Sequence, residues 1–294
     1  MKLGVGTVQF GLDYGISTQG GQTTREEVQK ILQVALKSGA RLIDTAASYG
    51  NSEEVLGGSL HHNHTFDIVT KTSAFSSDFI SYGDVDQMER TFHHSLKKMK
   101  QLSIYGLLIH NADNLLAEGG ELLMQKMLEL KQLGFVKKIG VSVYTGDQID
   151  RLLKRYTFDL IQIPINVLDQ RLLMDGQLSR LKHAGVEVHA RSVFLQGLLL
   201  MEPNNLPSYF DSVRPHLNRY HAYLSKNGIT PLQAALNFVI GLNDIDVAIC
   251  GVNNHNQLEE LVASVRPLPA EMRLMNFAIN DPVILNPSNW QKCS

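Results

Sequence analysis

The chain has 294 residues, of which 44% are hydrophobic, and a formal net charge of -2. The chain therefore lacks the excess of basic residues that is typical of nucleic-acid-binding proteins. Its two cysteines form no disulfide framework or zinc pattern, the N-terminus has no apolar signal-peptide core, and no run of about 18 apolar residues could cross a membrane. We therefore expect a cytoplasmic protein that binds neither nucleic acid nor membrane.

Short β-rich runs alternate along the chain with longer segments of helical period. The predicted strands are 3–8, 41–46, 66–71, 104–110, 137–143, 160–166, 186–193 and 247–252. A first helix is predicted between the hydroxyl cap Thr24 and Gly39. Further helices are predicted at 52–60, 84–100, 118–133, 146–155, 170–184, 210–227 and 255–264. An extra helix before the last strand begins at Thr230-Pro231 and carries apolar residues as far as Ile240.

Strands that are apolar on both faces, each followed by a helix, are typical of a parallel sheet that is covered on both sides. Eight of them predict an α/β fold of the closed (β/α)8 TIM barrel type. The alternative, an open doubly wound sheet, needs a glycine-rich phosphate turn after the first strand. Gly4, Gly6 and Gly11 do not match that motif, and we predict no helix there. No linker is apparent, so we expect one domain over 1–294, with 276–294 as a C-terminal tail.

Ionisable residues end three consecutive predicted strands. Asp44 lies near the end of the second, Lys71 ends the third and His110 ends the fourth, while Tyr49 follows the second. In a barrel of this kind the C-terminal ends of the strands face the active site. Each residue alone would be interpreted as a turn, packing or core residue. Because all four lie at the C-terminal ends of neighbouring strands, we predict that they meet at one end of the barrel.

Several segments resemble the aldo-keto reductases. DTAASYGNSEEVLG (44–57) is similar to the signature of that family, and IVTK (68–71) and LLIHNAD (107–113) resemble its lysine and histidine segments. Further similar segments follow in the same order: GVSVY (140–144), IQIPIN (161–166) and SVFLQGLLL (192–200). The resemblance runs from about residue 3 to residue 263. It implies an NAD(P)H-dependent reductase of a small aldehyde or ketone, with no protein partner evident.

The resemblance implies a catalytic tetrad of Asp44, Tyr49, Lys71 and His110. A carbonyl that accepts hydride needs a proton on its oxygen, and an unassisted phenol holds its proton too tightly to exchange it readily near pH 7. We expect Lys71 to stabilise the Tyr49 phenolate, Asp44 to hold Lys71, and a neutral His110 to orient the carbonyl.

The resemblance also implies a cofactor site. Four side chains would lie at the nicotinamide and its ribose: Ser142, Gln162, Thr7 and Asp44. Three residues would present their backbone to the pyrophosphate: Ser192, Phe194 and Gly197. The loop after the last strand would hold the adenosine end, through Gly251, Asn253, Gln257 and Glu260.

Three departures from the family pattern bear on the cofactor. Val143 stands where the family often has Asn. Arg191 stands where many members have an aromatic that stacks on the nicotinamide, so it would contact the cofactor, its phosphates or an acidic substrate. The last loop, 251–262, has no Lys or Arg for a 2′-phosphate. We therefore expect NADP(H) to be preferred only narrowly, with NAD(H) also accepted.

Other functions remain open at this stage. One alternative is a reductase-like regulatory subunit that binds NADP(H), turns over slowly and reports redox state to a partner. Another is a barrel isomerase or aldolase with Lys71 as a Schiff base. The histidines within 61–64 and at 93–94 have no ligand spacing, so we expect no metal.

Overall fold

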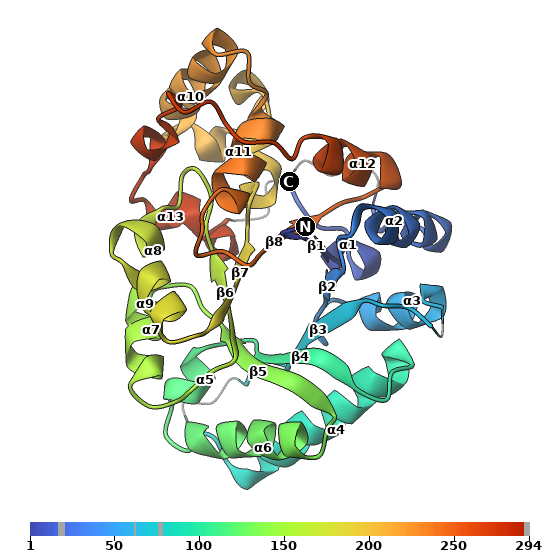
Figure 1. Ribbon diagram of the computed structural model, residues 1–294. Coiled ribbons are helices and arrows are strands. Elements are labelled where there is room, and N and C mark those ends of the chain that lie inside the picture. Colours follow the sequence, from blue (N-terminus) through green and yellow to red (C-terminus); the bar gives the residue numbers. More distant parts are fainter. Residues whose placement is uncertain (17–20, 62, 76–78, 291–294) are drawn as a thin grey trace.

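The computed structural model describes residues 1–16, 21–61, 63–75 and 79–290. Its parallel strands close into one barrel in chain order, β1 to β8, with helices around the outside (Figure 1). The strands are β1 (Leu3–Gly6), β2 (Leu42–Asp44), β3 (Asp67–Lys71), β4 (Ile104–Ile109), β5 (Val136–Ser142), β6 (Leu160–Pro164), β7 (Glu187–Arg191) and β8 (Val247–Gly251). The prediction of a (β/α)8 barrel is confirmed.

The α-helices follow the strands in the predicted order. They are α1 (Val8–Gly11), α2 (Arg25–Ser38), α3 (Ser52–Ser59), α4 (Tyr82–Met99), α5 (Asp113–Leu116), α6 (Gly120–Gln132), α7 (Gly146–Leu153), α8 (Arg171–Met174), α9 (Gln177–His183), α10 (Arg214–Lys226), α11 (Pro231–Ile240), α12 (His255–Ala263) and α13 (Pro282–Leu285). Short 3-10 turns are η1 (Leu195–Leu200), η2 (Pro203–Asn205), η3 (Ser208–Phe210), η4 (Leu274–Phe277) and η5 (Pro287–Asn289). None of the described helices is both long and apolar enough to cross a bilayer.

Two helical expectations were wrong. A short helix, α1, does open after β1: the Thr7 carbonyl accepts from the Phe10 N–H and the Val8 carbonyl from the Leu12 N–H, both at 2.9 Å. Thr7 itself is still tied to β2, because its N–H and hydroxyl both donate to the Asp44 carbonyl, at 2.9 and 3.0 Å. The helix predicted at 170–184 is broken into α8 and α9, because Gly176 adopts a left-handed φ of 78° between them. The periodicity of the apolar residues continues across residue 176, so the sequence pattern did not indicate the break between α8 and α9.

The barrel interior is layered along its axis. Side chains alternate between the two faces of a strand, so residues two apart face the same way. One apolar cluster consists of Leu42, Val69, Leu108, Leu160 and Ile249. Two residues further along the same strands come Asp44, Lys71, His110, Gln162 and Gly251. The polar residues therefore lie one layer above an apolar floor, at the C-terminal ends of the strands.

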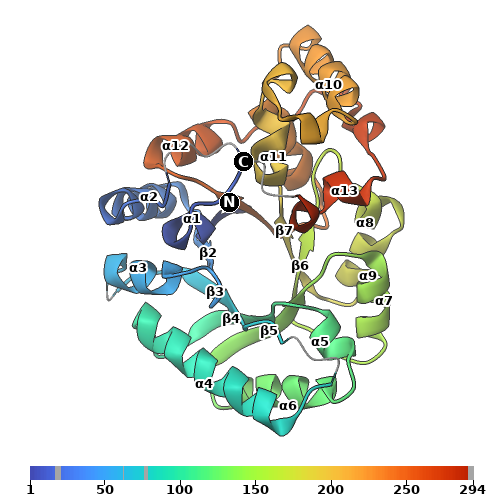
Figure 2. The ribbon, with the colours of Figure 1, turned by 180° about the vertical axis from the view of Figure 1, so that it is seen from behind.

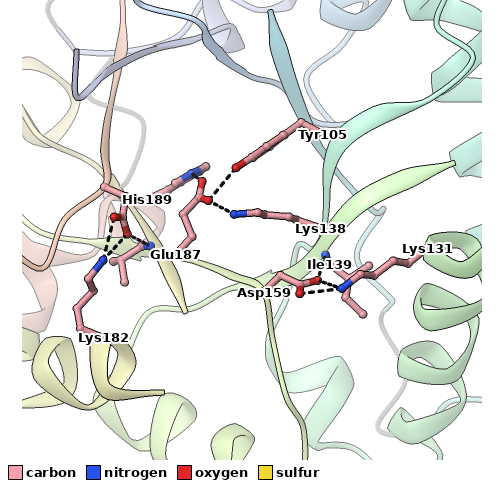
Figure 3. A network of polar contacts seen from close by, with 10 residues as sticks. Tyr105, Lys131, Lys138, Ile139, Asp159, Lys182, Glu187 and His189 are labelled. Atoms are coloured by element: carbon pink, nitrogen blue, oxygen red, sulfur yellow. Dashed lines mark hydrogen bonds and ion pairs between the residues drawn. The ribbon is translucent and has the colours of Figure 1, made fainter. Parts of the chain in front are cut away.

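A second polar network lies toward the opposite, N-terminal ends of the strands (Figure 3). Glu187 accepts a hydrogen bond from the Tyr105 hydroxyl at 2.8 Å, pairs with the Lys138 ammonium, and lies 2.6 Å from His189 Nε2. These contacts together hold the pKa of Glu187 down at about 2 even though burial opposes ionisation. In a (β/α)8 barrel this end serves stability rather than catalysis.

The segment between β7 and β8 forms an outer lobe. Helix α10 lies outward of α11, at the top of both views (Figures 1 and 2). The described part of the C-terminal tail packs against this lobe: Trp290 contacts the Phe210 ring edge-on, with 4.9 Å between ring centres, and its indole N–H donates to the Ile284 carbonyl. The described part of the tail therefore packs on the lobe through Trp290 and Asn289, whose carbonyl accepts from the Tyr209 hydroxyl at 3.1 Å.

Candidate active site

Lys71 and Asp44 form a buried ion pair between β3 and β2. Lys71 Nζ lies 2.8 Å from Asp44 Oδ1 and 2.7 Å from Oδ2, and it also donates to the Thr45 carbonyl at 2.9 Å. Burial opposes the ammonium form, but the Asp44 carboxylate outweighs it and raises the pKa of Lys71 above its ordinary value. Gln162 holds the carboxylate from the other side, since its Nε2 donates to Asp44 Oδ1 at 2.8 Å. The cation is therefore fixed in place and permanently charged at neutral pH.

Tyr49 lies directly above this ion pair. Lys71 Nζ is 5.1 Å from the centre of the Tyr49 ring. The turn that carries Tyr49 packs against α1 with no space to spare: a Cβ at Gly11 would lie 1.8 Å from the Tyr49 carbonyl oxygen, and one at Gly50 would lie 2.4 Å from the Gly11 carbonyl oxygen. Gly50 also has a left-handed φ of 57°, which glycine adopts without strain. The close approach of these two backbones positions the phenol.

His110 completes the group at the end of β4. Its ring meets the Tyr49 ring edge-on, with 6.0 Å between their centres, and its Nδ1 lies 3.3 Å from Ser48 Oγ. Burial, followed by the positive charge of Lys71, lowers the pKa of His110 to about 4. His110 is therefore neutral near pH 7 and can hydrogen-bond without carrying charge.

One cavity of about 630 Å³ connects these residues with the predicted cofactor residues. Tyr49 and His110 line it, together with the complete set of predicted cofactor residues: Thr7, Asp44, Ser142, Gln162, Arg191, Ser192, Phe194, Gly197, Gly251, Asn253, Gln257 and Glu260. Lys71 lies behind Asp44 rather than on the cavity wall. The cavity thus extends from the tetrad to the loop before α12, as a dinucleotide requires.

Two buried oxygens in this cavity lack a partner among the described residues. They are Gln9 Oε1, beside Gly251, and Asn253 Oδ1, in the last loop. Buried acceptors normally have a hydrogen-bond donor, and a ligand in this cavity can supply one. Ribose hydroxyls and an adenine amino group are such donors, so the residues present fit a nicotinamide dinucleotide.

Arg191 is held over the cavity by neutral groups. Its Nη2 donates to the Val143 carbonyl at 3.0 Å, its Nη1 lies 3.3 Å from Ser192 Oγ, and its guanidinium carbon is 4.2 Å from the centre of the Tyr144 ring. Arg191 has no ion-pair partner among the described residues. The side chain therefore brings an uncompensated positive charge to the cavity.

The N-terminus of α12 is already engaged by a carboxylate. Glu27 on α2 accepts from the His255 N–H at 2.8 Å and contacts the His255 ring. These two hydrogen bonds lower the pKa of Glu27 to about 2, so it is ionised at neutral pH. The Asn253 N–H is taken by Gln257 Oε1, and the Gln257 N–H by Asn254 Oδ1. This loop thus lacks a cation and has an anion beside it.

Sequence reasoning missed several residues at the cavity. Tyr14 follows α1 and Gln196 lies in η1, and the Gln196 amide donates to the Tyr14 hydroxyl at 2.9 Å. Tyr144, beneath Arg191, and the start of α11 also line it. Among these, only Tyr144 had a signal in the sequence, because it is the last residue of GVSVY. No group of metal ligands occurs among the described residues, which leave out His62.

Comparisons with known proteins agree with this geometry. The model of the "Aldo/keto reductase family" matches residues 2–273. The chain is 24% identical to "Aldo-keto reductase YhdN" of Bacillus subtilis, over 88% of this chain and 83% of the relative. In structure it is similar to the aldo-keto reductase AKR11C1 from Bacillus halodurans (TM-score 0.74, 20% identity, 94% of this chain and 90% of that one). It is also similar to the glycerol dehydrogenase AKR11B4 from Gluconobacter oxydans (TM-score 0.72, 18% identity, 100% and 94%).

The family match covers nearly the whole chain, so the protein belongs to the aldo/keto reductase family. It is accordingly an NAD(P)H-dependent oxidoreductase of the kind that acts on carbonyl groups.

Proposed function

We propose that the protein reduces an aldehyde or ketone to an alcohol, with Tyr49 as the proton donor. The observation that supports this most directly is the Lys71 ammonium, fixed by Asp44 and 5.1 Å from the centre of the Tyr49 ring. When bound, the reduced nicotinamide supplies the hydride. The twelve cavity-lining residues named above are our proposal for its binding site, and one small carbonyl compound is the proposed substrate.

Each residue of the tetrad has a distinct role in this proposal. The Tyr49 hydroxyl donates its proton to the carbonyl oxygen as negative charge develops there. Lys71 stabilises the phenolate that remains, because an ammonium nearby favours the anionic form. Asp44 keeps Lys71 charged and oriented, and neutral His110 offers a hydrogen bond that aligns the carbonyl oxygen.

The burial of Lys71 argues against Schiff-base chemistry. A nucleophilic amine must lose its proton and reach the substrate. Lys71 is 1% exposed and paired with a carboxylate that raises its pKa, so it meets neither condition. Its charge, rather than its lone pair, is what the site uses.

For the cofactor we propose NADP(H) with only a narrow margin over NAD(H). Family membership favours NADP(H), whereas the last loop offers hydrogen bonds but no cation to a 2′-phosphate, and Glu27 lies beside it. We also propose a cytoplasmic location, in keeping with Cys250 as a buried free thiol.

The test is hydride transfer by the purified protein with NADPH and NADH against a panel of aldehydes and ketones. Tyr49→Phe should slow single-turnover hydride transfer by about 100-fold or more, the usual contribution of a positioned acid. The dissociation constants of the cofactors should stay nearly unchanged, since the phenol acts on the substrate. Undiminished transfer in Tyr49→Phe would refute the proton-donor role. Fast single turnover limited by very slow cofactor release, with a stable protein partner, would favour the regulatory subunit instead.

A further inference from the structure

The position of Arg191 is fixed by its surroundings. It ends β7 on the same face as Glu187 and His189, but at the cavity end of the barrel. The Val143 carbonyl, the Ser192 hydroxyl and the Tyr144 ring hold the guanidinium. A guanidinium braced in this way has little freedom to swing out to solvent, so its charge stays at the cavity wall.

The charge of Arg191 is not cancelled within the cavity. Two carboxylates line the cavity, Asp44 and Glu260. Asp44 is already neutralised by Lys71 through two short hydrogen bonds, and Glu260 lies on α12, at the end of the cavity that the adenosine would occupy. The three groups that hold Arg191 are all neutral. Asp44, Lys71 and Arg191, the charged groups at the reaction end of the cavity, together carry one net positive charge.

The field of Arg191 extends across the reaction site. It is one of the charges that disfavour protonation of His110, on the opposite part of the cavity wall. Its guanidinium also bonds to the carbonyl of Val143, the neighbour of Ser142, which the proposed function assigns to the nicotinamide carboxamide. Anything bound between Ser142 and His110 therefore lies within reach of this charge.

We propose that Arg191 makes the cavity distinguish the redox state of its cofactor, binding the neutral reduced nicotinamide more tightly than the cationic oxidised one. This inference rests on the proposed function. The physical reason is that a fixed cation repels a second cation, and in a partly desolvated site one such interaction changes binding by about tenfold or more. Oxidised cofactor would leave readily, and the protein would remain loaded with reduced cofactor.

The test compares dissociation constants of NADP⁺ and NADPH, and of NAD⁺ and NADH, measured by calorimetry for the wild type and three variants. Arg191→Gln removes the charge and keeps hydrogen-bond donors, Arg191→Lys keeps the charge, and Arg151→Gln removes a charge from the exposed face of α7 as a control. The wild type should bind the reduced form about tenfold or more tightly. Arg191→Gln should lower this ratio about tenfold, mainly by tightening the oxidised form, and the other two variants should retain it.

Four results would overturn the inference. An unchanged ratio in Arg191→Gln would show that the charge has no role in discrimination. If Arg191→Gln weakens the binding of both redox forms equally, Arg191 binds the cofactor phosphates. If it raises the KM of the carbonyl substrate and leaves the cofactor dissociation constants unchanged, Arg191 binds the substrate. Loss of the preference in Arg191→Lys would show that shape, not charge, matters. Failure of the wild type to bind either redox form would instead refute the proposed function itself.

Discussion

Lys71 donates to both carboxylate oxygens of Asp44, and neither side chain is more than 6% exposed. Two charges placed so deep in the barrel depend on each other, because either one alone would be a buried, uncompensated ion. The pair therefore has a structural function as well as its proposed catalytic one.

The first prediction concerns the stability of this pair. Asp44→Asn and Lys71→Met should each lower the free energy of unfolding by about 3–5 kcal/mol, because each leaves one buried charge without its partner. The double variant should lose less than the sum of the two, since no uncompensated charge remains. Urea unfolding curves measure all three. Strict additivity would mean that the two side chains do not stabilise each other.

The second prediction concerns pH and His110. Its pKa is about 4 in the folded protein against 6.5 for an ordinary histidine. Between these values the unfolded chain binds a proton that the folded protein does not. Stability should therefore fall as pH drops from about 6.5 toward 4, by up to about 1.4 kcal/mol per pH unit from this residue.

His110→Gln removes that proton and should flatten the pH dependence. The measurement is the free energy of unfolding at pH 7 and pH 5, for the wild type and the variant. If both lose the same amount over this interval, His110 does not titrate as the structure indicates.

The third prediction concerns cofactor choice. NADPH and NADH should differ by less than about tenfold in dissociation constant for the wild type. The last loop offers the 2′-phosphate no cation, and a hydrogen bond without one contributes a net of only about 1 kcal/mol. Asn253→Arg should tighten NADPH relative to NADH by about tenfold or more, because the loss of the Asn253 acceptor affects both cofactors alike and the new cation favours only the 2′-phosphate. Glu27→Gln should also favour NADPH, by removing an anion next to the loop.

Asn227→Arg, on the exposed end of α10, adds the same charge away from the cavity and should change neither constant. If Asn253→Arg tightens NADH as much as NADPH, the loop does not contact the 2′ position.

The fourth prediction concerns the network at the N-terminal end of the barrel. Glu187→Gln should cost about 1–3 kcal/mol of stability, because Lys138 loses its partly buried ionic partner. Cofactor binding and turnover should be unaffected, since Glu187 begins β7 and its partners lie near the starts of β4 and β5, at the opposite end of the strands from the tetrad. Asp147→Asn, in an exposed pair with Arg151, should cost less than about 1 kcal/mol as a matched control. A change in cofactor affinity in Glu187→Gln would show that the two ends of the barrel are coupled.

The barrel, and the meeting of several ionisable side chains at one end of it, were predictable because both depend on local patterns. Alternating strands and helices indicate the fold, and parallel strands bring their C-terminal ends to one edge, so Asp44, Lys71 and His110 had to converge. The contacts that are particular to this site were not predictable from the sequence. Glu27 reaches His255 across 228 positions of sequence, and Arg191 stacks on Tyr144 from a different strand. Such contacts follow from packing between segments that are distant in sequence. The spacing of apolar residues within one segment carries no information about them.

The contact between Gly11 and Gly50 limits how this site can be altered. Because a methyl group at either position would collide with backbone, no rotamer change can relieve the clash. Randomised libraries should therefore keep both glycines fixed and diversify the cavity rim instead, at Tyr14, Leu200 and Leu232. Selectivity for new carbonyl compounds can then be evolved there without disturbing the phenol that we propose as the proton donor.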